Sequence, residues 1–564
     1  ALRYNQTGSY NVAVGVDALE NTTVSNNTAV GNNALKASTS GGYNTAIGDR
    51  ANYSNTTGEH NTSLGSQSLY FNTTGNKNTA LGHQALATNT TGSGNTAVGD
   101  QAIETNTTGA YLTGVGDRAL HLNTTGDYNN ALGAMALYSN TTGASNTAVG
   151  HQALTNSTTA SNNTAVGYDA MEQTTTGTLN TCIGFDSGKN STTANSNVAV
   201  GGKALRDNST GGNNTAVGKS ALISNTTADN NTAVGMEALA NNTTGTLNTA
   251  IGIEALELNT TGSSITAIGA LSMANASTGG SNGYTTAVGA GSGRYATGAN
   301  NSTLIGYEAG YRITGGDDYT FVGYKAGGAF GSNNITGQSH VGIGNNALGN
   351  VTTATHNVAV GKTSMYGLTT GSQNTAVGNY SLGNGVVTGD SNTAIGYTAL
   401  YSNTTGYHNV AVGRNALGTA TTAYHNTAVG YGAMENTTTA VYVTAVGDKA
   451  LQANTTGHRS VAVGTNALIL NTTGQKNTAI GVSALESNTT GDHNTAVGID
   501  ALGSNTGNQN TAMGDRASDS VTYAGNTVSY GFRSGDTITT GSNNVTIGAQ
   551  AGSYSTGVTT GTRN

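Results

Sequence analysis

The sequence of 564 residues has no proline, no tryptophan, one cysteine and few charged residues. Charged residues make up 9% of the chain, against roughly 25% of an ordinary soluble domain. The single cysteine, Cys182, excludes an intrachain disulfide framework and a cysteine-based zinc site. The net charge of −8 comes without a block of basic residues, so a nucleic-acid partner is not expected. No run of 18 apolar residues occurs, so membrane insertion of this segment is not expected either.

Chemically reactive side chains are too scattered to predict a catalytic centre. Acidic residues do not pair at any fixed spacing, so the sequence supports neither a calcium loop nor an acid–base dyad. Among the ten histidines only His408 and His425 recur in adjacent units, in Tyr-His-Asn triplets 17 residues apart. Because metal sites usually need three or four converging ligands, we expect a stacked, exposed pair there. We therefore expect no enzymatic activity, no metal and no cofactor.

What the sequence has in abundance is repetition. The motif Asn-Thr-Ala-Val-Gly recurs along the chain, and its 32 glycines run from Gly15 to Gly548 with 26 of the 31 intervals equal to 17 residues. The full unit reads N-T-A-V-G-x-x-A-L-x-x-N-T-T-G-x-x. Such a unit is too short for the helical hairpin of helical repeat proteins. Asn, Thr and Gly are poor helix formers, whereas Thr, Val and Ile suit strands.

The period predicts an all-β fold, a parallel β-solenoid of about 32 coils in which each 17-residue unit forms one coil. Its two periodic glycines permit tight bends. Coils stacked about 4.8 Å apart would give a rod of roughly 150 Å. We predict that residues 1–10 form a partial repeat, that 11–548 form a single β-solenoid with an irregular subtype at 270–345, and that 549–564 form a partial or frayed C-terminal repeat.

Strand alternation assigns a predicted core. In Thr-Ala-Val-Gly, the Thr (or Val) and the Val, Ile or Leu two residues later should point inward together. The alanine between them should face outward, where its small size favours close packing against another chain. The Ala-Leu pair, such as Ala85-Leu86, should add a second inward anchor, and Cys182, which stands in an alanine place, should be packed and inert. Each coil thus offers only two or three sizeable apolar side chains, so a single coil is not stable without its neighbours. Oligomerisation through the alanine face would add further stability.

Asparagine recurs in two columns. The first opens the repeat unit, as at Asn44, Asn61, Asn78 and Asn95. The second opens the Asn-Thr-Thr triplets and includes Asn55, Asn72, Asn89, Asn106, Asn123 and Asn140. Identical amides at strand spacing can form hydrogen-bonded ladders. The triplets also match the N-glycosylation sequon, but glycans about 5 Å apart would crowd, which favours ladders.

The repeat is most irregular near residues 284–330. Glycine replaces the leucine of the Ala-Leu pair at Gly293, Gly310 and Gly327, and aromatic residues gather there. In one interpretation the rings replace the lost leucine volume. In the other they form a ligand- or glycan-contacting belt, since Tyr and Arg favour interfaces. The candidate belt comprises Tyr295, Tyr307, Tyr311, Arg312, Tyr319 and Tyr324.

The Thr/Val-Ala-Val/Ile-Gly-x-x-Ala core resembles the head repeat of trimeric autotransporter adhesins (YadA-like heads), which carry a Ser-Val-Ala-Ile-Gly-x-x-Ala unit. The longer unit, with Ala-Leu and Asn-Thr-Thr-Gly, is similar to repeats of phage tail fibres and bacterial surface fibres. The resemblance covers about Asn11 to Gly548. It implies a left-handed parallel β-roll, often a parallel homotrimer with small residues near the threefold axis. The unit here is three residues longer than the adhesin repeat.

We expect a non-enzymatic extracellular structural fibre or adhesin shaft, a stiff low-charge rod at a cell surface or in a virion. Its expected partners are further copies of itself, as a homo-oligomer or filament, and surface glycans or a host receptor. A phage tail-fibre shaft is one alternative. An ice-binding β-solenoid is another, because regular threonine rows can order water, although each Asn-Thr-Thr triplet gives only one outward threonine per coil.

Overall fold

A computed structural model describes residues 1–276, 283–328, 334–383 and 385–553 of the chain. Across these residues the only regular elements are 32 three-residue β-strands, and no helix occurs. The predicted all-β solenoid with a repeat of about 17 residues is confirmed. The chain divides into two compact units, Ala1–Gly283 and Tyr284–Asn564.

Each unit contains 16 of the strands. Those of the first unit are β1 (Val12–Val14), β2 (Thr28–Val30), β3 (Thr45–Ile47), β4 (Thr62–Leu64), β5 (Thr79–Leu81), β6 (Thr96–Val98), β7 (Thr113–Val115), β8 (Asn130–Leu132), β9 (Thr147–Val149), β10 (Thr164–Val166), β11 (Thr181–Ile183), β12 (Val198–Val200), β13 (Thr215–Val217), β14 (Thr232–Val234), β15 (Thr249–Ile251) and β16 (Thr266–Ile268).

The second unit starts with the strand that follows residue 283. Its strands are β17 (Thr286–Val288), β18 (Thr303–Ile305), β19 (Thr320–Val322), β20 (Val341–Ile343), β21 (Val358–Val360), β22 (Thr375–Val377), β23 (Thr393–Ile395), β24 (Val410–Val412), β25 (Thr427–Val429), β26 (Thr444–Val446), β27 (Val461–Val463), β28 (Thr478–Ile480), β29 (Thr495–Val497), β30 (Thr511–Met513), β31 (Val528–Tyr530) and β32 (Val545–Ile547).

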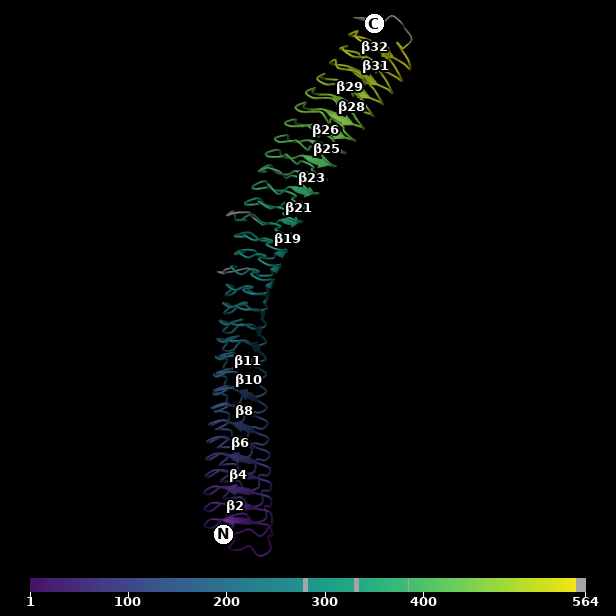
Figure 1. Cartoon of the computed structure of the whole chain (residues 1–564). Helices are drawn as coiled ribbons and strands as arrows, with labels where there is room; N and C mark the ends of the chain where they lie inside the picture. Colours follow the sequence, from purple (N-terminus) through teal and green to yellow (C-terminus); the bar gives the residue numbers. More distant parts are fainter. Residues whose placement is uncertain (277–282, 329–333, 384, 554–564) are drawn as a thin grey trace. The chain divides into compact units, whose positions relative to one another are not determined.

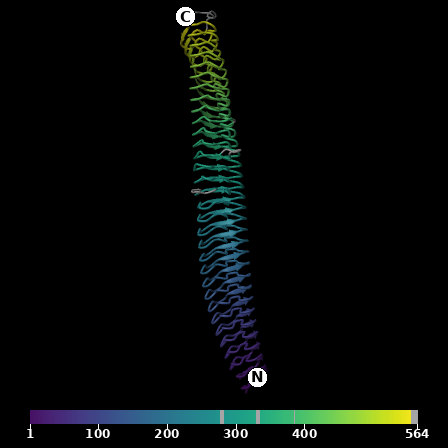
Figure 2. The same ribbon diagram turned by 90° about the vertical axis from the view of Figure 1, so that its left-hand side faces the viewer.

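Within each unit, consecutive strands pair in parallel and in register. Between β6 and β7, for example, Thr96 lies beside Thr113 and Val98 beside Val115. Figure 1 shows this stacking in the first unit, where the labelled strands from β2 to β11 lie one coil above another. Figure 2 shows the coils of each unit after a 90° turn. Because every coil repeats its neighbour, equivalent side chains form columns along the unit.

Backbone hydrogen bonds between coils continue outside the strands. The Leu86 N–H donates to the Ala102 carbonyl at 2.9 Å, and the Thr90 N–H donates to the Thr107 carbonyl at 2.9 Å. The start of the chain follows the same pattern, since the Leu2 N–H donates to the Ala18 carbonyl at 2.9 Å. A proline at such a position would remove one of these donors, which accounts for the absence of proline from the sequence.

The predicted orientation of the strand side chains is wrong. In β6 the middle residue, Ala97, is fully buried, whereas Thr96 and Val98 are only half-buried. The same pattern of a buried middle residue holds from β2 to β31. The alanine column therefore lines the interior of the coil, and the threonine and valine columns face outward. Oligomerisation through an alanine face is excluded by this arrangement, while the inward Ala-Leu anchor is confirmed by the full burial of Ala85 and Leu86.

The narrow interior explains why alanine faces inward. The strand alanine and the leucine of the Ala-Leu pair share one space, and a larger residue at one place requires a smaller one at the other. Leu304 replaces the strand alanine where Gly310 replaces the leucine, and an added Cβ at Gly310 would lie 2.7 Å from Leu304 Cδ2. Phe321 and Gly327 form a second such pair, with the added Cβ 2.4 Å from the Phe321 ring. The interpretation that rings replace leucine volume is confirmed for Phe321.

Tight turns place both glycine and leucine in unusual backbone conformations. Gly99 ends its strand motif with φ near +136°, and an added Cβ there would lie 2.4 Å from the Gly116 carbonyl oxygen. Leu86 has φ of 56°. The left-handed conformation costs a non-glycine residue about 1–2 kcal/mol. Full burial of the leucine side chain, worth roughly 1.5–3 kcal/mol, offsets that cost.

The shared interior space makes a prediction about Gly114, the residue in the alanine place of β7. An added Cβ there would lie 2.6 Å from Cγ1 of Ile103 in the preceding coil. Gly114→Ala alone should therefore destabilise the first unit by about 1–3 kcal/mol through overpacking. Adding Ile103→Leu restores the usual Ala-with-Leu combination and should recover most of the loss. Guanidinium midpoints followed by circular dichroism would measure both, and equal midpoints for Gly114→Ala and the unmodified chain would contradict the shared-space interpretation.

Candidate functional site

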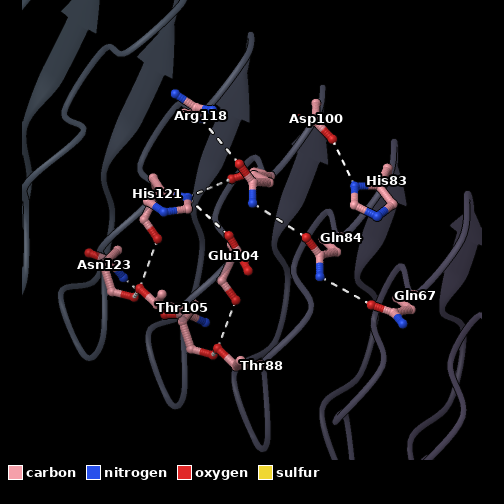
Figure 3. A network of polar contacts seen from close by, with 12 residues as sticks. Gln67, His83, Gln84, Thr88, Asp100, Glu104, Thr105, Arg118, His121 and Asn123 are labelled. Carbon is pink, nitrogen blue, oxygen red and sulfur yellow. Dashed lines mark hydrogen bonds and ion pairs between the residues drawn. The ribbon is translucent and has the colours of Figure 1, made fainter.

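Polar side chains on the surface mostly pair with the equivalent residue of the next coil. Figure 3 shows one such network, in which Gln84 Nε2 donates to Gln67 Oε1 at 3.1 Å and Arg118 Nε donates to Gln101 Oε1 at 3.1 Å. In the same view His83 Nδ1 lies 3.0 Å from Asp100 Oδ1. Within the described ranges no group of three or more His, Cys, Asp or Glu side chains could hold a metal ion. These contacts join coils and do not form a reactive centre.

The most densely charged cluster is also internally paired. Lys189 Nζ lies 2.7 Å from Asp169 Oδ2 and 3.3 Å from both Glu172 Oε2 and Asp186 Oδ1. Hydrogen bonding to Asp169 raises the pKa of Lys189, so this ammonium stays charged. The nearby thiol of Cys182 is fully buried, and burial raises its pKa to about 12. An inert, packed cysteine was expected, and this environment provides it.

The outward face of the strands is a uniform surface that repeats from coil to coil. None of the described strands contains a charged residue. One outward column is mostly threonine, and the other is Val, Ile or Leu in all strands but β30 and β31, with exposed fractions such as 43% at Leu64 and 42% at Leu81. An apolar column of this length is unusual for a surface that stays in water.

The second asparagine column forms an amide ladder. Asn89 Nδ2 donates to Asn72 Oδ1 at 2.7 Å, and Asn106 Nδ2 donates to Asn89 Oδ1 at 2.8 Å. Each amide also donates within its own turn, as Asn89 does to the Gly92 carbonyl at 2.9 Å. Neighbouring members are joined in the same way and all six are fully buried: Asn55, Asn72, Asn89, Asn106, Asn123 and Asn140. A glycan could be attached to these nitrogens only if the coil opened.

The first asparagine column bonds chiefly to backbone. Asn95 Oδ1 accepts the Leu112 N–H at 2.9 Å, and Asn95 Nδ2 donates to the Gly109 carbonyl at 2.9 Å. In one coil His340 takes the asparagine place and reproduces both bonds. Its Nε2 lies 2.8 Å from the Ala354 carbonyl oxygen, and its Nδ1 accepts the Asn357 N–H at 3.3 Å. The neutral imidazole thus replaces the amide, a role that aligning the units by column would have revealed.

The predicted aromatic belt separates into several environments. Tyr307 and Tyr324 are each 47% exposed and stack on one another with ring centroids 5.4 Å apart. Tyr295 and Tyr311 meet edge to face at 5.2 Å, and the Arg312 guanidinium lies 5.2 Å from the Tyr295 ring centroid. These two surface groups stand on different columns and share only the coil of β18, so a single continuous belt is not formed.

Tyr319 does not belong to the surface. It is fully buried in the asparagine place of its coil, and its hydroxyl donates to the carbonyl oxygens of Gly315 and Gly337. Burial raises the pKa of Tyr319 well above its ordinary value. The expectation that Tyr319 contacts a ligand is therefore wrong, because the ring is part of the coil interior.

One surface column was missed when the sequence was read by residue type alone. We name it the basic stripe. It comprises the residue just before the first asparagine column in six successive coils, namely His408, His425, Tyr442, Arg459, Lys476 and His493. All six are exposed. The expected stacking of His408 on His425 is confirmed by a ring-centroid distance of 4.8 Å.

No protein-family model and no curated protein matches the sequence. Among the described residues there is also no helix of the length and apolarity needed to cross a membrane.

His340 generates a prediction about pH. Burial lowers the pKa of His340 to about 4 from an ordinary 6.5. Between these values the unfolded chain therefore binds more protons than the folded chain. The free energy of unfolding should be at its full value above pH 6.5 and should decrease as the pH drops toward 4. His340→Asn keeps both hydrogen bonds without a titrating group and should remove this part of the pH dependence.

Denaturation midpoints measured from pH 7.5 to pH 4 for the unmodified chain and His340→Asn would test this. His151→Asn, which removes an exposed histidine, serves as the control and should follow the unmodified chain. Parallel pH curves for all three proteins would show that His340 is not the group responsible.

Proposed function

We propose that the chain is a non-enzymatic structural fibre that assembles with further copies of itself through the outward strand face. The observation that carries this proposal is the uncharged, largely apolar surface that extends along the strands of each unit. The resemblance to adhesin heads and to phage and bacterial surface fibres supports an extracellular fibre or adhesin shaft, with a parallel homotrimer as the assembly.

The spacing of the face favours a copy of the same chain as partner. Its columns repeat once per coil, about 4.8 Å apart. A partner that matches these columns over many coils needs the same period, which another copy in parallel orientation has. Residues such as Leu64 and Leu81 would then lose their remaining contact with water. Summed over 16 coils per unit, even partial burial of such side chains stabilises an assembly.

The stacking itself supports a mechanical role. A solenoid in which each coil contacts only its neighbours gains stability by repetition, and its length follows from the number of coils. Such a structure separates what is attached at its two ends. The described charged side chains that pair across coils, such as Lys189 with Asp169, reinforce the stack.

This proposal predicts that charge on the strand face prevents assembly. Leu64→Lys combined with Leu81→Lys places two ammonium groups on neighbouring strands of the face. Analytical ultracentrifugation should show the unmodified chain as an oligomer of defined mass and the double variant as a monomer with unchanged circular dichroism. Thr74→Lys combined with Thr91→Lys provides the matched control, because it adds the same charge to the same two coils at exposed threonines of the Asn-Thr-Thr turns.

The control should remain assembled. A monomeric unmodified chain would overturn self-assembly through this face, and so would equal dissociation of both double variants.

A second candidate function is ice binding. The outward orientation of the first strand residue places threonine in a regular row, as at Thr215, Thr232, Thr249 and Thr266, beside the row of Val and Ile. A flat row of alternating hydroxyl and methyl groups can order water at the strand spacing.

The two functions make opposite demands on the same face, because an assembled fibre covers the threonine row. Ice binding predicts a monomer with thermal hysteresis that is lost in Thr232→Lys combined with Thr249→Lys. An oligomer without thermal hysteresis would leave the structural fibre as the function of this face.

A further inference from the structure

We propose that the basic stripe of the second unit binds a linear acidic polysaccharide, with the acid groups of the polymer in register with the coils. The stripe lies two residues before the first strand residue of each coil, so it borders the strand face on which the proposed fibre assembly depends. Its residues are the variable ones of the repeat, and all six have φ between 54° and 59°, which directs successive side chains outward in the same way.

The stripe concentrates positive and proton-accepting side chains in a chain of net charge −8. Five of its six members are His, Arg or Lys. Lys476 Nζ lies 3.2 Å from His493 Nε2 in the next coil. Among the ion pairs of the described residues, none includes Arg459 or Lys476. Neither of these two permanent cations is paired with a carboxylate among the described residues, so both can pair with an external anion.

Carboxylates border the stripe at its two ends, and each accepts a backbone N–H. Asp390 Oδ1 accepts the Ser372 N–H at 2.7 Å, and Asp492 Oδ1 accepts the Gln475 N–H at 2.7 Å. Between these two coils the stripe and the column beside it contain no acidic residue. The interval is thus a short electropositive row on an otherwise acidic protein.

An aromatic column lies directly beside the histidines. Tyr407 and Tyr424 stack with ring centroids 4.9 Å apart, and Tyr407 contacts the His408 ring edge to face at 5.2 Å. His425 stacks on Tyr442 at 5.2 Å. Exposed rings next to cations suit the apolar faces and acid groups of a uronate polymer, because a tyrosine offers a flat apolar body and a hydroxyl.

The spacing selects a linear polymer over a compact anion. Side chains of the stripe recur about every 4.8 Å, the rise of one coil. A polyuronate carries one carboxylate on each sugar ring and advances by a similar distance per ring. Arg459 can bind one carboxylate through two parallel N–H donors. Nucleic acid is a poorer match, since duplex binding depends on many phosphate contacts and the stripe holds only two permanent cations.

Proton uptake should accompany binding. Histidine gains its charge between pH 8 and 5, and a charged imidazolium pairs with a carboxylate where a neutral ring does not. The rings of His408 and His425 lie 4.8 Å apart, so a row of carboxylates at the coil spacing can reach both. His458, in the neighbouring column, already accepts the Val441 N–H through Nδ1 at 3.0 Å. With Asp390 and Asp492 engaged at the ends, His408, His425 and His493 are the groups expected to make binding tighter at low pH.

Fluorescence anisotropy with labelled oligomers of polygalacturonate tests the proposal at pH 5.5 and 7.5 in low salt. The full chain should bind more tightly at pH 5.5. Arg459→Gln combined with Lys476→Gln should weaken binding about tenfold, the effect of losing two charge pairs on an exposed surface. Arg414→Gln combined with Lys449→Gln removes the same charge from other columns of the same unit and should bind as the unmodified chain does.

Further probes identify the partner class. Methyl-esterified polygalacturonate has the same sugar rings without the charge and should not bind, and His408→Asn combined with His425→Asn should flatten the pH dependence. Absence of polygalacturonate binding at pH 5.5, equal weakening by the control variant, or equally tight binding of poly-L-glutamate or single-stranded DNA would each overturn the proposal.

Discussion

The structure depends on one constraint, the in-register stacking of coils through backbone hydrogen bonds. Each coil donates to and accepts from equivalent positions of its neighbours, as between Leu86 and Ala102 or between Thr90 and Thr107. In-register stacking also places identical side chains about 4.8 Å apart. Uncharged residues tolerate this distance, and like charges do not. The low charge, the absence of proline and the long columns of Asn, Thr and Ala are therefore consequences of the same geometry.

A second constraint is the narrow interior of the coil. Strand alanine and turn leucine fill it together, and the exchange of sizes at Leu304 with Gly310 and at Phe321 with Gly327 keeps the filled volume similar. The buried amides complete the interior at its polar side. Asn72 and Asn89 bond to one another and to backbone, so a buried polar column costs little because its hydrogen bonds are made. His340 satisfies the same requirement with an imidazole.

Much of this fold was predictable from the period, because 17-residue repetition of strand-forming residues and glycine leaves few architectures. The inward Ala-Leu pair and the amide column followed from the repeat as well. Alternation predicted that Thr96 and Val98 share a face, but not which face. Hydrophobicity favoured valine inside, whereas the space beside leucine admits only a side chain of alanine size. Tyr319 was misplaced for a related reason, since its column, and not its residue type, determines its burial.

The same column logic separates scaffold from recognition. Positions that bond or pack between coils admit few residue types, so they carry little information about a partner. The residues just before the first asparagine column project from a left-handed backbone and tolerate Tyr, His, Arg, Lys, Ser and Asn. A partner can be recognised only at such tolerant positions or through the uniform strand face. Because one column is repetitive and the other variable, a single repeat unit can serve assembly at one column and local binding chemistry at a neighbouring one.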